Sequence, residues 1–237
     1  MKAMIFAAGL GTRLKPFTEN HPKALAVVNG KTLLQRNIEY LKSYGIDEIV
    51  INVHHFADQI IAFLEENNYF DISIEISDET DQVLETGGGL VKAKANFTED
   101  FLVINADILT DLNLAEFIKS HQENKALVTL AVSDRNSSRK LYFSNKNELK
   151  GWKNLNTNEE IKATDSLENL TELAFSGIHL ISPTLFEHIH QHGKFSIMKV
   201  YMDLMQSQSI KGFDHSGGIL IDVGRPESII EAEEYFK

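Results

Sequence analysis

"AMIFAAGLGTRLKPFT", residues 3–18, is the stretch that decides the fold. It opens with an apolar run that ends at Gly9, as a buried parallel strand does at its carboxyl end. Glycines and cations follow at once. Glycines let a backbone approach a ligand and present N–H groups to it, and an arginine fork matches phosphate oxygens. The stretch predicts either a polyphosphate-binding loop or a tight surface turn with solvated cations.

The next part of the chain alternates between strand and helix patterns. The expected strands are 47–53, 71–77, 101–107 and 126–132, and the expected helices between them are 31–45, 56–68, 88–97 and 113–124. This rhythm predicts a doubly wound, Rossmann-like α/β fold in a single domain, with a mixed, mostly parallel sheet covered on both faces. Right-handed crossovers should connect the parallel strands.

The second half of the chain has a looser pattern. Residues 139–145 and 148–155 resemble a two-stranded insert, and 173–181 and 218–224 resemble strands. A helix is expected to open at Ser182 and Pro183, and another at Pro226, because proline is favoured in the first helical turn.

Two common nucleotide motifs fail by one defining residue each. In a G-x-G-x-x-G dinucleotide motif, Leu14 would replace the third glycine, and the acidic residue expected about 20 positions later is missing. "NGKT" (29–32) ends like a P-loop, but the first glycine of that motif would fall on Leu25. A nicotinamide oxidoreductase is therefore disfavoured, and "NGKT" predicts a turn followed by a helix start.

Composition restricts the class of protein. The chain has 237 residues, no cysteine and a net charge of −11. The acidic balance disfavours nucleic acid and anionic membranes as partners, but a local cationic pocket can still bind a small phosphorylated ligand. No apolar run reaches membrane-spanning length, and the start does not resemble a signal peptide, so we expect a cytoplasmic protein. The sequence gives no indication of an oligomeric state.

"AAGLGTRLKPFTENHPKALAVV" (7–28) resembles the signature of the sugar-1-phosphate nucleotidyltransferases, in which G-x-G-T-R-L precedes P-K by about ten residues. The resemblance continues in "LETGGGLVKA" (84–93), "LVINADIL" (102–109), "FSGIHLI" (175–181) and "LIDVGRPES" (220–228). The segments "ETGGG", "GWKNL" and "FSGI" are most similar to those of the N-acetylmuramate-1-phosphate uridylyltransferases of peptidoglycan recycling. The resemblance implies a nucleotide-binding half at 1–132 and a sugar-binding half at 133–237.

The resemblance also implies the reaction and its residues. A nucleoside triphosphate, which is UTP in the resembled subgroup, would react with a sugar 1-phosphate to give a nucleotide-sugar and pyrophosphate. The implied nucleotide-binding residues are Ala8, Gly9, Gly11, Thr12, Arg13, Lys23, Glu85, Thr86, Gly87 and Gly88, of which Arg13 and Lys23 are catalytic. The implied sugar-binding residues are Asn105, Asn154, Ser176 and Gly177. Asp107 and Asp222 are the implied Mg²⁺ ligands.

The residues themselves agree with this chemistry. A sugar phosphate is already an anion, so the reaction needs positioning and charge neutralisation rather than a general base. Asp107 and Asp222 each close an apolar strand; either alone could be a turn aspartate, but a pair suits a hard divalent cation. The glycines of "ETGGG" would leave room for the base and offer backbone groups to it.

The chain departs from the common pattern at two places. The resembled family often has an E-K-P motif whose lysine binds the sugar phosphate. This motif is absent here, because "GWKNLN" places Asn154 and Leu155 at the positions of its glutamate and lysine; Trp152 or Lys153 could replace the lysine. The resembled family also has a glutamine that reads the base, just before the segment that contacts it. No such glutamine is evident here, and Gln82 is the nearest candidate. Guanylyl or thymidylyl transfer to mannose, heptose or glucose 1-phosphate is therefore an alternative, as is a nucleotide-sugar sensor without turnover.

Overall fold

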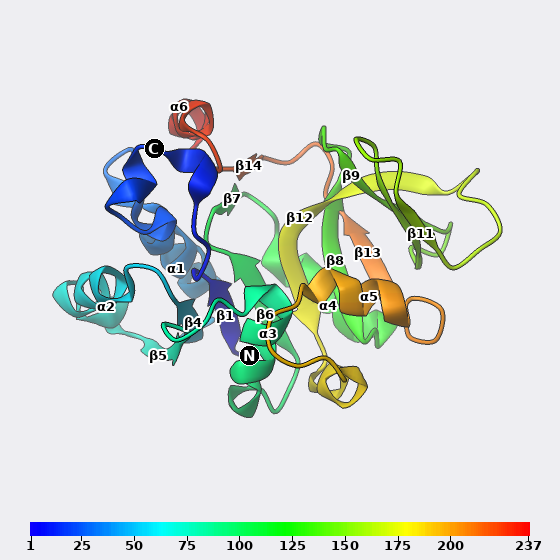
Figure 1. Cartoon of the computed structure of the whole chain (residues 1–237), viewed down its shortest axis with the longest axis horizontal. Coiled ribbons are helices and arrows are strands. Elements are labelled where there is room, and N and C mark those ends of the chain that lie inside the picture. The colour runs from blue at the N-terminus through cyan, green and yellow to red at the C-terminus, as the bar shows by residue number, and fades with distance from the viewer.

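A ten-stranded mixed sheet forms the centre of the computed structural model, which describes residues 1–237 (Figure 1). Its strands lie in the order β11-β10-β9-β12-β6-β1-β4-β5, with β8 beside β12 and β13 beside β8. The strands are β1 (Ala3–Phe6), β4 (Glu48–Val53), β5 (Ser73–Asp78), β6 (Phe101–Asn105), β8 (Val128–Ser133), β9 (Arg139–Phe143), β10 (Leu149–Asn154), β11 (Glu160–Lys162), β12 (Thr171–Ile181) and β13 (Ile210–Asp214). β5, β4, β1 and β6 are parallel, and β12 runs antiparallel to β6.

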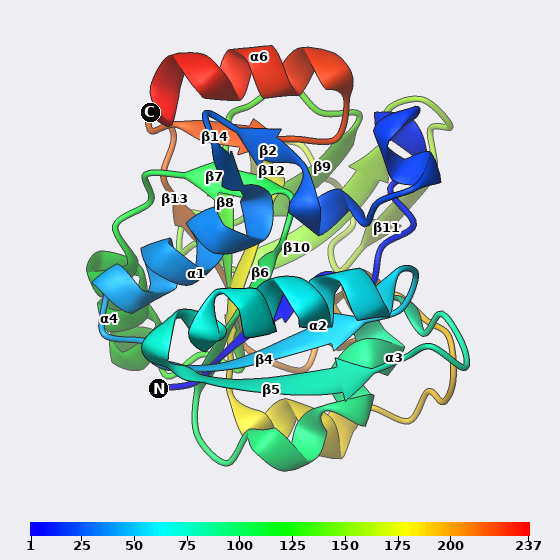
Figure 2. The ribbon, with the colours of Figure 1, turned by 90° about the vertical axis from the view of Figure 1, so that its left-hand side faces the viewer.

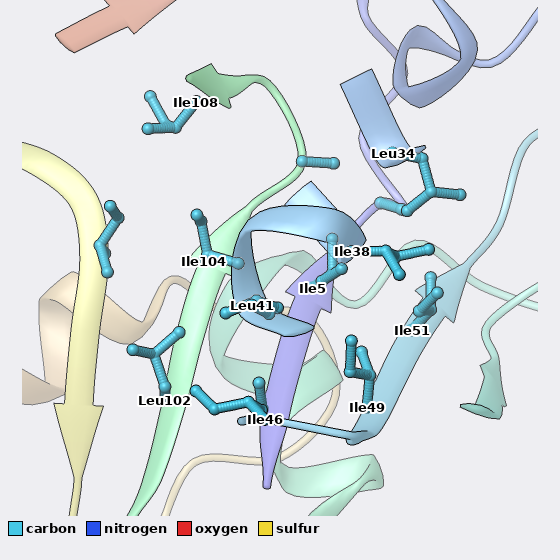
Figure 3. Close-up of a cluster of buried hydrophobic side chains, with 14 of the residues drawn as sticks. Ile5, Leu34, Ile38, Leu41, Ile46, Ile49, Ile51, Leu102, Ile104 and Ile108 are labelled. Atoms are coloured by element: carbon cyan, nitrogen blue, oxygen red, sulfur yellow. The ribbon is translucent and has the colours of Figure 1, made fainter. Parts of the chain in front are cut away.

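Helices cover both faces of the sheet, which confirms the doubly wound α/β fold. They are α1 (Leu33–Ser43), α2 (Ala57–Glu66) and α4 (Leu114–Asn124) on one face, and α3 (Glu85–Lys92) and α5 (Ile197–Leu204) on the other. Successive residues of β1 serve opposite faces: Ile5 packs into the first cluster and Met4 into the second. Figure 3 shows side chains of α1, including Leu34 and Ile38, packed over Ile5 and its neighbouring strands.

α1 shows how local sequence determines a helix. Its apolar residues recur at helical spacing and are fully buried, as Leu34, Ile38 and Leu41 are. Thr32 caps the start by accepting a hydrogen bond from the Gln35 N–H at 3.0 Å. Gly45, with a φ of 75°, follows the last turn, where an αL residue without a Cβ ends the helix.

A third apolar cluster lies away from the central sheet. α6 (Pro226–Tyr235) covers two short antiparallel pairs, β2 (Val27–Val28) with β3 (Lys31–Thr32), and β7 (Ile108–Thr110) with β14 (Leu220–Asp222) (Figure 2). Leu14, Val28, Ile221 and Ala232 are buried together here. The cluster therefore fixes the loop after β1 against β14, near the other end of the chain.

Most expected elements of the first half are confirmed within a few residues, and the second half differs more. The predicted two-stranded insert is part of the central sheet and gains a third strand, β11. The helix predicted from Ser182 is only a short 3-10 turn, Pro183–His188, and Ser182 does not cap it. α5, β7 and β13 were not predicted. None of the helices is long and apolar enough to cross a membrane.

The segment before α5 packs directly on α3. The Phe195 carbonyl accepts a hydrogen bond from the Gly87 N–H at 2.9 Å. A Cβ on Gly88 would lie 2.1 Å from the Gly193 carbonyl oxygen, well inside contact distance. The glycine run of "ETGGG" thus allows close packing between two segments that are far apart in the sequence.

Gly88→Ala should therefore destabilise the protein. The added Cβ must displace backbone, and over-packing of this kind costs about 1–3 kcal/mol of unfolding free energy. Urea unfolding measures the loss. Gly9→Ala is the matched control, because a Cβ there meets no atom within 4 Å. Equal stability of the two variants would refute the packing explanation.

Candidate active site

A cavity of about 550 Å³ opens at the carboxyl edge of the parallel strands. Open α/β sheets bind their ligands at this edge, and the volume suits a small molecule. Nine of the residues implied by the resemblance line it: Ala8, Gly9, Gly11, Thr12, Lys23, Glu85, Thr86, Asn105 and Asp107. The structure therefore gathers the glycine loop, the start of α3 and the end of β6 around one space.

The loop after β1 is shaped by Gly11. Its φ of 60° is a left-handed conformation, and a Cβ there would lie 2.9 Å from the Lys23 side chain. The Thr18 hydroxyl donates to the Gly11 carbonyl at 2.9 Å. Leu14 is buried in the third cluster, which explains an apolar residue where a dinucleotide motif would have glycine.

Two aspartates from distant parts of the chain meet beside this loop. Asp222 pairs with Ile108 in the β7–β14 ladder, and the Val223 N–H donates to the Asp107 carbonyl at 2.8 Å. The Lys23 ammonium forms an ion pair with Asp107 and lies 3.9 Å from Asp222 Oδ1. Arg13 Nη2 lies 4.0 Å from Asp222 Oδ2, and neither Arg13 nor Asp222 is among the residues that line the cavity. Two carboxylates and two cations thus converge.

The two carboxylates are chemically suited to a divalent cation. Asp222 Oδ1 is buried and has no hydrogen-bond partner, so it retains a free acceptor. Mg²⁺ commonly takes one or two carboxylates and completes its shell with phosphate oxygens and water. The structure contains no group of three or more acidic or histidine side chains that could hold a metal by themselves. A cation bound here would therefore need oxygens from a ligand.

A buried polar network, not predicted from the sequence, ties three strand ends together. Asn52 Oδ1 accepts from the Ala7 N–H at 2.8 Å, and Asn52 Nδ2 donates to Glu79 Oε1 at 2.7 Å. Asn52 and Glu79 are 3% and 1% exposed and line the cavity. Burial raises the pKa of Glu79, although the hydrogen bond from Asn52 opposes this shift. The sequence feature that could have predicted this network is the presence of polar residues, Asn52 and Glu79, at the ends of apolar strands.

The far wall of the cavity comes from α3 and the segment before α5. Lys194 and Ser196 line it, and Lys194 Nζ lies 3.6 Å from Glu85 Oε1. Both residues were missed because α5 was not predicted. Gly87 and Gly88 do not line the cavity, and their N–H groups point to the Phe195 carbonyl. The interpretation that these glycines make room for a base is replaced by the packing described above.

The implied sugar residues separate into two groups. Gly177 lies against Asn105, because a Cβ there would be 3.0 Å from Asn105 Nδ2. Ser176 is fully buried and hydrogen-bonded to His215 Nε2 at 2.8 Å. Asn154, by contrast, does not line the cavity; its Oδ1 accepts from the Asn156 N–H within the β10–β11 turn.

The two proposed replacements for the missing lysine also have other contacts. Trp152 packs against the second core cluster, and Lys153 Nζ lies 3.9 Å from Glu160. The cavity is not lined by either residue. The segment "GWKNLN" therefore packs and pairs within the β9–β10–β11 part of the sheet in this structure.

Comparison with known proteins identifies the family of the chain. The family model described as nucleotidyl transferase matches residues 2–142. The N-acetylmuramate alpha-1-phosphate uridylyltransferase of Caulobacter vibrioides is 30% identical over 98% of this chain and 95% of its own length. The UTP–glucose-1-phosphate uridylyltransferase of Synechocystis sp. is 34% identical, but the match covers 55% of this chain and only 36% of that relative.

Solved structures extend the likeness to the whole fold. HddC from Yersinia pseudotuberculosis, in a crystal structure with GMP-PN, superposes with a TM-score of 0.81 at 25% identity. The superposition covers 100% of this chain and 99% of HddC. The sequence resemblance, the fold and the family match therefore agree, and the chain belongs to the nucleotidyl transferase family as a sugar-1-phosphate nucleotidyltransferase.

Proposed function

We propose that the enzyme joins UTP and N-acetylmuramate 1-phosphate to give UDP-N-acetylmuramate and pyrophosphate, a reaction of peptidoglycan recycling. The observation that carries this proposal is the similarity to the Caulobacter uridylyltransferase, which spans nearly the full length of both chains. A second relative, from Synechocystis sp., is also named as a uridylyltransferase. Residues 1–132 would contribute most nucleotide contacts and residues 133–237 most sugar contacts.

The reaction needs little from the protein beyond position and charge. An oxygen of the sugar phosphate attacks the α-phosphorus in line and forms the new P–O bond. The bond from the α-phosphorus to the bridging oxygen breaks, and pyrophosphate leaves with that electron pair. Because the nucleophile is already an anion, no side chain has to remove a proton.

The cations beside the loop would stabilise this transfer. Lys23 would contact the α-phosphate and the sugar phosphate, where charge develops, and Arg13 would bind the β- and γ-phosphates. The backbone N–H groups of Ala8, Gly9, Gly11 and Thr12 would hold the triphosphate. Lys23 is supported by its place in the cavity wall between two carboxylates.

Asp107 and Asp222 would hold Mg²⁺ together with phosphate oxygens. When bound, the cation would neutralise charge on the reacting phosphates. The free acceptor on Asp222 Oδ1 supports this assignment. Lys23 already lies between the same two carboxylates, so it would keep them from repelling each other before the cation and the nucleotide arrive.

The base would lie against Glu85 and Thr86 at the start of α3, opposite the glycine loop. Asn105 and Gly177 would face the sugar. A second candidate is guanylyl transfer, favoured by the likeness over the whole chain to HddC in its structure with GMP-PN. The two candidates differ only in base and sugar and share the same phosphate chemistry.

Activity should require a divalent cation. Excess chelator should abolish pyrophosphate release, and added Mg²⁺ should restore it. Asp222→Asn should raise the Mg²⁺ concentration for half-maximal activity at least about tenfold, the scale on which even outer-shell partners alter metal affinity. Asp165→Asn, on an exposed loop, is the control. Full activity in excess chelator would remove the metal assignment.

Lys23→Ala should lower kcat by about 10²–10³, because it removes a charge at the transferring phosphorus. The loss of stability should be smaller, since the Asp107 and Asp222 side chains are 23% and 35% exposed and their ion pairs with Lys23 are only partly removed from water. Steady-state kinetics and urea unfolding measure the two effects. Lys15→Ala is the matched control, because Lys15 pairs only with exposed Glu19. Near-normal kcat in Lys23→Ala would require another phosphate-binding residue.

A grid of four nucleoside triphosphates and several sugar 1-phosphates tests the substrates. We expect the highest kcat/KM for UTP with N-acetylmuramate 1-phosphate, measured as pyrophosphate release at equal concentrations. Preference for GTP with mannose 1-phosphate, and no turnover of the proposed pair, would reject the uridylyl assignment and leave the family assignment intact.

A further inference from the structure

Only four buried side-chain polar atoms in the structure have no hydrogen-bond partner. One is Asp222 Oδ1, which lies beside Lys23. The other three are Ser133 Oγ, Arg135 Nε and His215 Nδ1. An unsatisfied buried polar atom is costly, so three such atoms in one region indicate a missing partner.

These three atoms belong to neighbouring strand ends. β8 ends at Ser133, and β13 runs parallel beside it and ends just before His215. The His215 N–H donates to the Val132 carbonyl at 3.0 Å, which continues the ladder past the end of β13. On the other side of β8, Ser133 pairs with Ala174 of β12 (Figure 1). The residues therefore share one edge of the sheet.

This edge adjoins one wall of the cavity, but Ser133, Arg135, Ser176 and His215 do not line the cavity themselves. β12 runs antiparallel to both β6 and β8, so the ends of β6 and β8 lie on the same side of the sheet. Ser176 of β12 contacts His215, and the adjacent Gly177 contacts Asn105 in the cavity wall. Ser133, Arg135, Ser176 and His215, the Arg135–His215 cluster, thus adjoin the residues proposed to face the sugar.

The unused atoms of the cluster are hydrogen-bond donors. Arg135 Nη2 donates to the Phe175 carbonyl at 2.9 Å, which fixes the guanidinium and leaves its Nε–H free. A Ser176 hydroxyl that donates to His215 Nε2 leaves the ring proton on Nδ1. Burial lowers the pKa of His215, and Arg135 lowers it further, so the neutral ring with one N–H prevails near neutral pH.

Neighbouring carboxylates do not satisfy these donors. Asp214 and Asp111 are close enough to oppose the lowering of the His215 pKa. Asp214 Oδ1, however, accepts from Ser216, and Asp111 Oδ1 accepts from the Ile219 N–H at 2.7 Å. Glu172 forms its ion pair with Lys140, at 3.5 Å from Lys140 Nζ, and not with Arg135. The Arg135 charge is therefore left without a carboxylate partner in the protein.

We propose that the Arg135–His215 cluster binds a carboxylate carried by the sugar 1-phosphate. This inference rests on the proposed function, because N-acetylmuramate differs from N-acetylglucosamine by a lactyl ether that ends in a carboxylate. A guanidinium edge matches a carboxylate in geometry and charge. A neutral hydroxyl or carbonyl would leave the positive charge of Arg135 unbalanced. The cluster then determines which amino sugar the enzyme accepts.

Arg135→Met tests this assignment, since it keeps the apolar stem and removes the guanidinium. With saturating UTP, we compare kcat/KM for N-acetylmuramate 1-phosphate and N-acetylglucosamine 1-phosphate. The variant should lose about 10–100-fold with the first sugar, mainly through KM, and less than about twofold with the second. Arg139→Met, an exposed arginine at the start of β9, should change neither value.

Ser133→Ala provides a second variant that should fold, because the hydroxyl it removes has no partner in the protein. It should lose about 3–10-fold with the carboxylate sugar alone. If these variants affect both sugars equally, or affect neither, the cluster does not bind the carboxylate. The proposed function would still stand in that case, provided that the wild-type enzyme prefers N-acetylmuramate 1-phosphate. A wild-type enzyme without that preference would overturn both.

Discussion

The pairing of β7 with β14 is the contact on which the site depends. It places Asp222, near the end of the chain, beside Asp107, at the end of β6. Both carboxylates then face Lys23, which the left-handed turn at Gly11 brings close. The ladder has only three residue pairs, so the apolar cluster beneath α6 must supply much of its stability. The charged site is therefore held by an apolar cluster that touches no ligand.

The parts of the fold that local patterns determine were predictable. The strand at 3–8, helix α1 and the strand before Asp107 are confirmed, because burial imposes periodicity on each segment alone. The sequence also carries the periodic pattern of α5, in which Ile197, Val200 and Tyr201 share one face, but no helix is predicted there. The helix predicted from Ser182 is a 3-10 turn that ends at His188. The local sequence does not indicate this early end, because Ser182 and Pro183 favour the start of a helix.

Other features depend on contacts between distant segments. Glycine serves a ligand or a packing contact equally well, because both require a missing Cβ, and only the position of Gly193 shows which applies at Gly88. Asn52 and Glu79 look like ordinary strand-end residues until β1, β4 and β5 are placed side by side. The placement of Asn154 away from the cavity follows from the pairing of β10, which motif alignment does not reveal.

The packing of residues 193–196 on α3 also affects when the site can form. The first half of the chain carries the glycine loop, yet one wall of its cavity comes from Lys194 and Ser196. β6 likewise obtains its neighbour β12 only from the second half. During synthesis from the amino terminus, the cavity stays open on one side until most of the chain has left the ribosome. A nascent chain therefore passes through most of its translation before all walls of the cavity are in place.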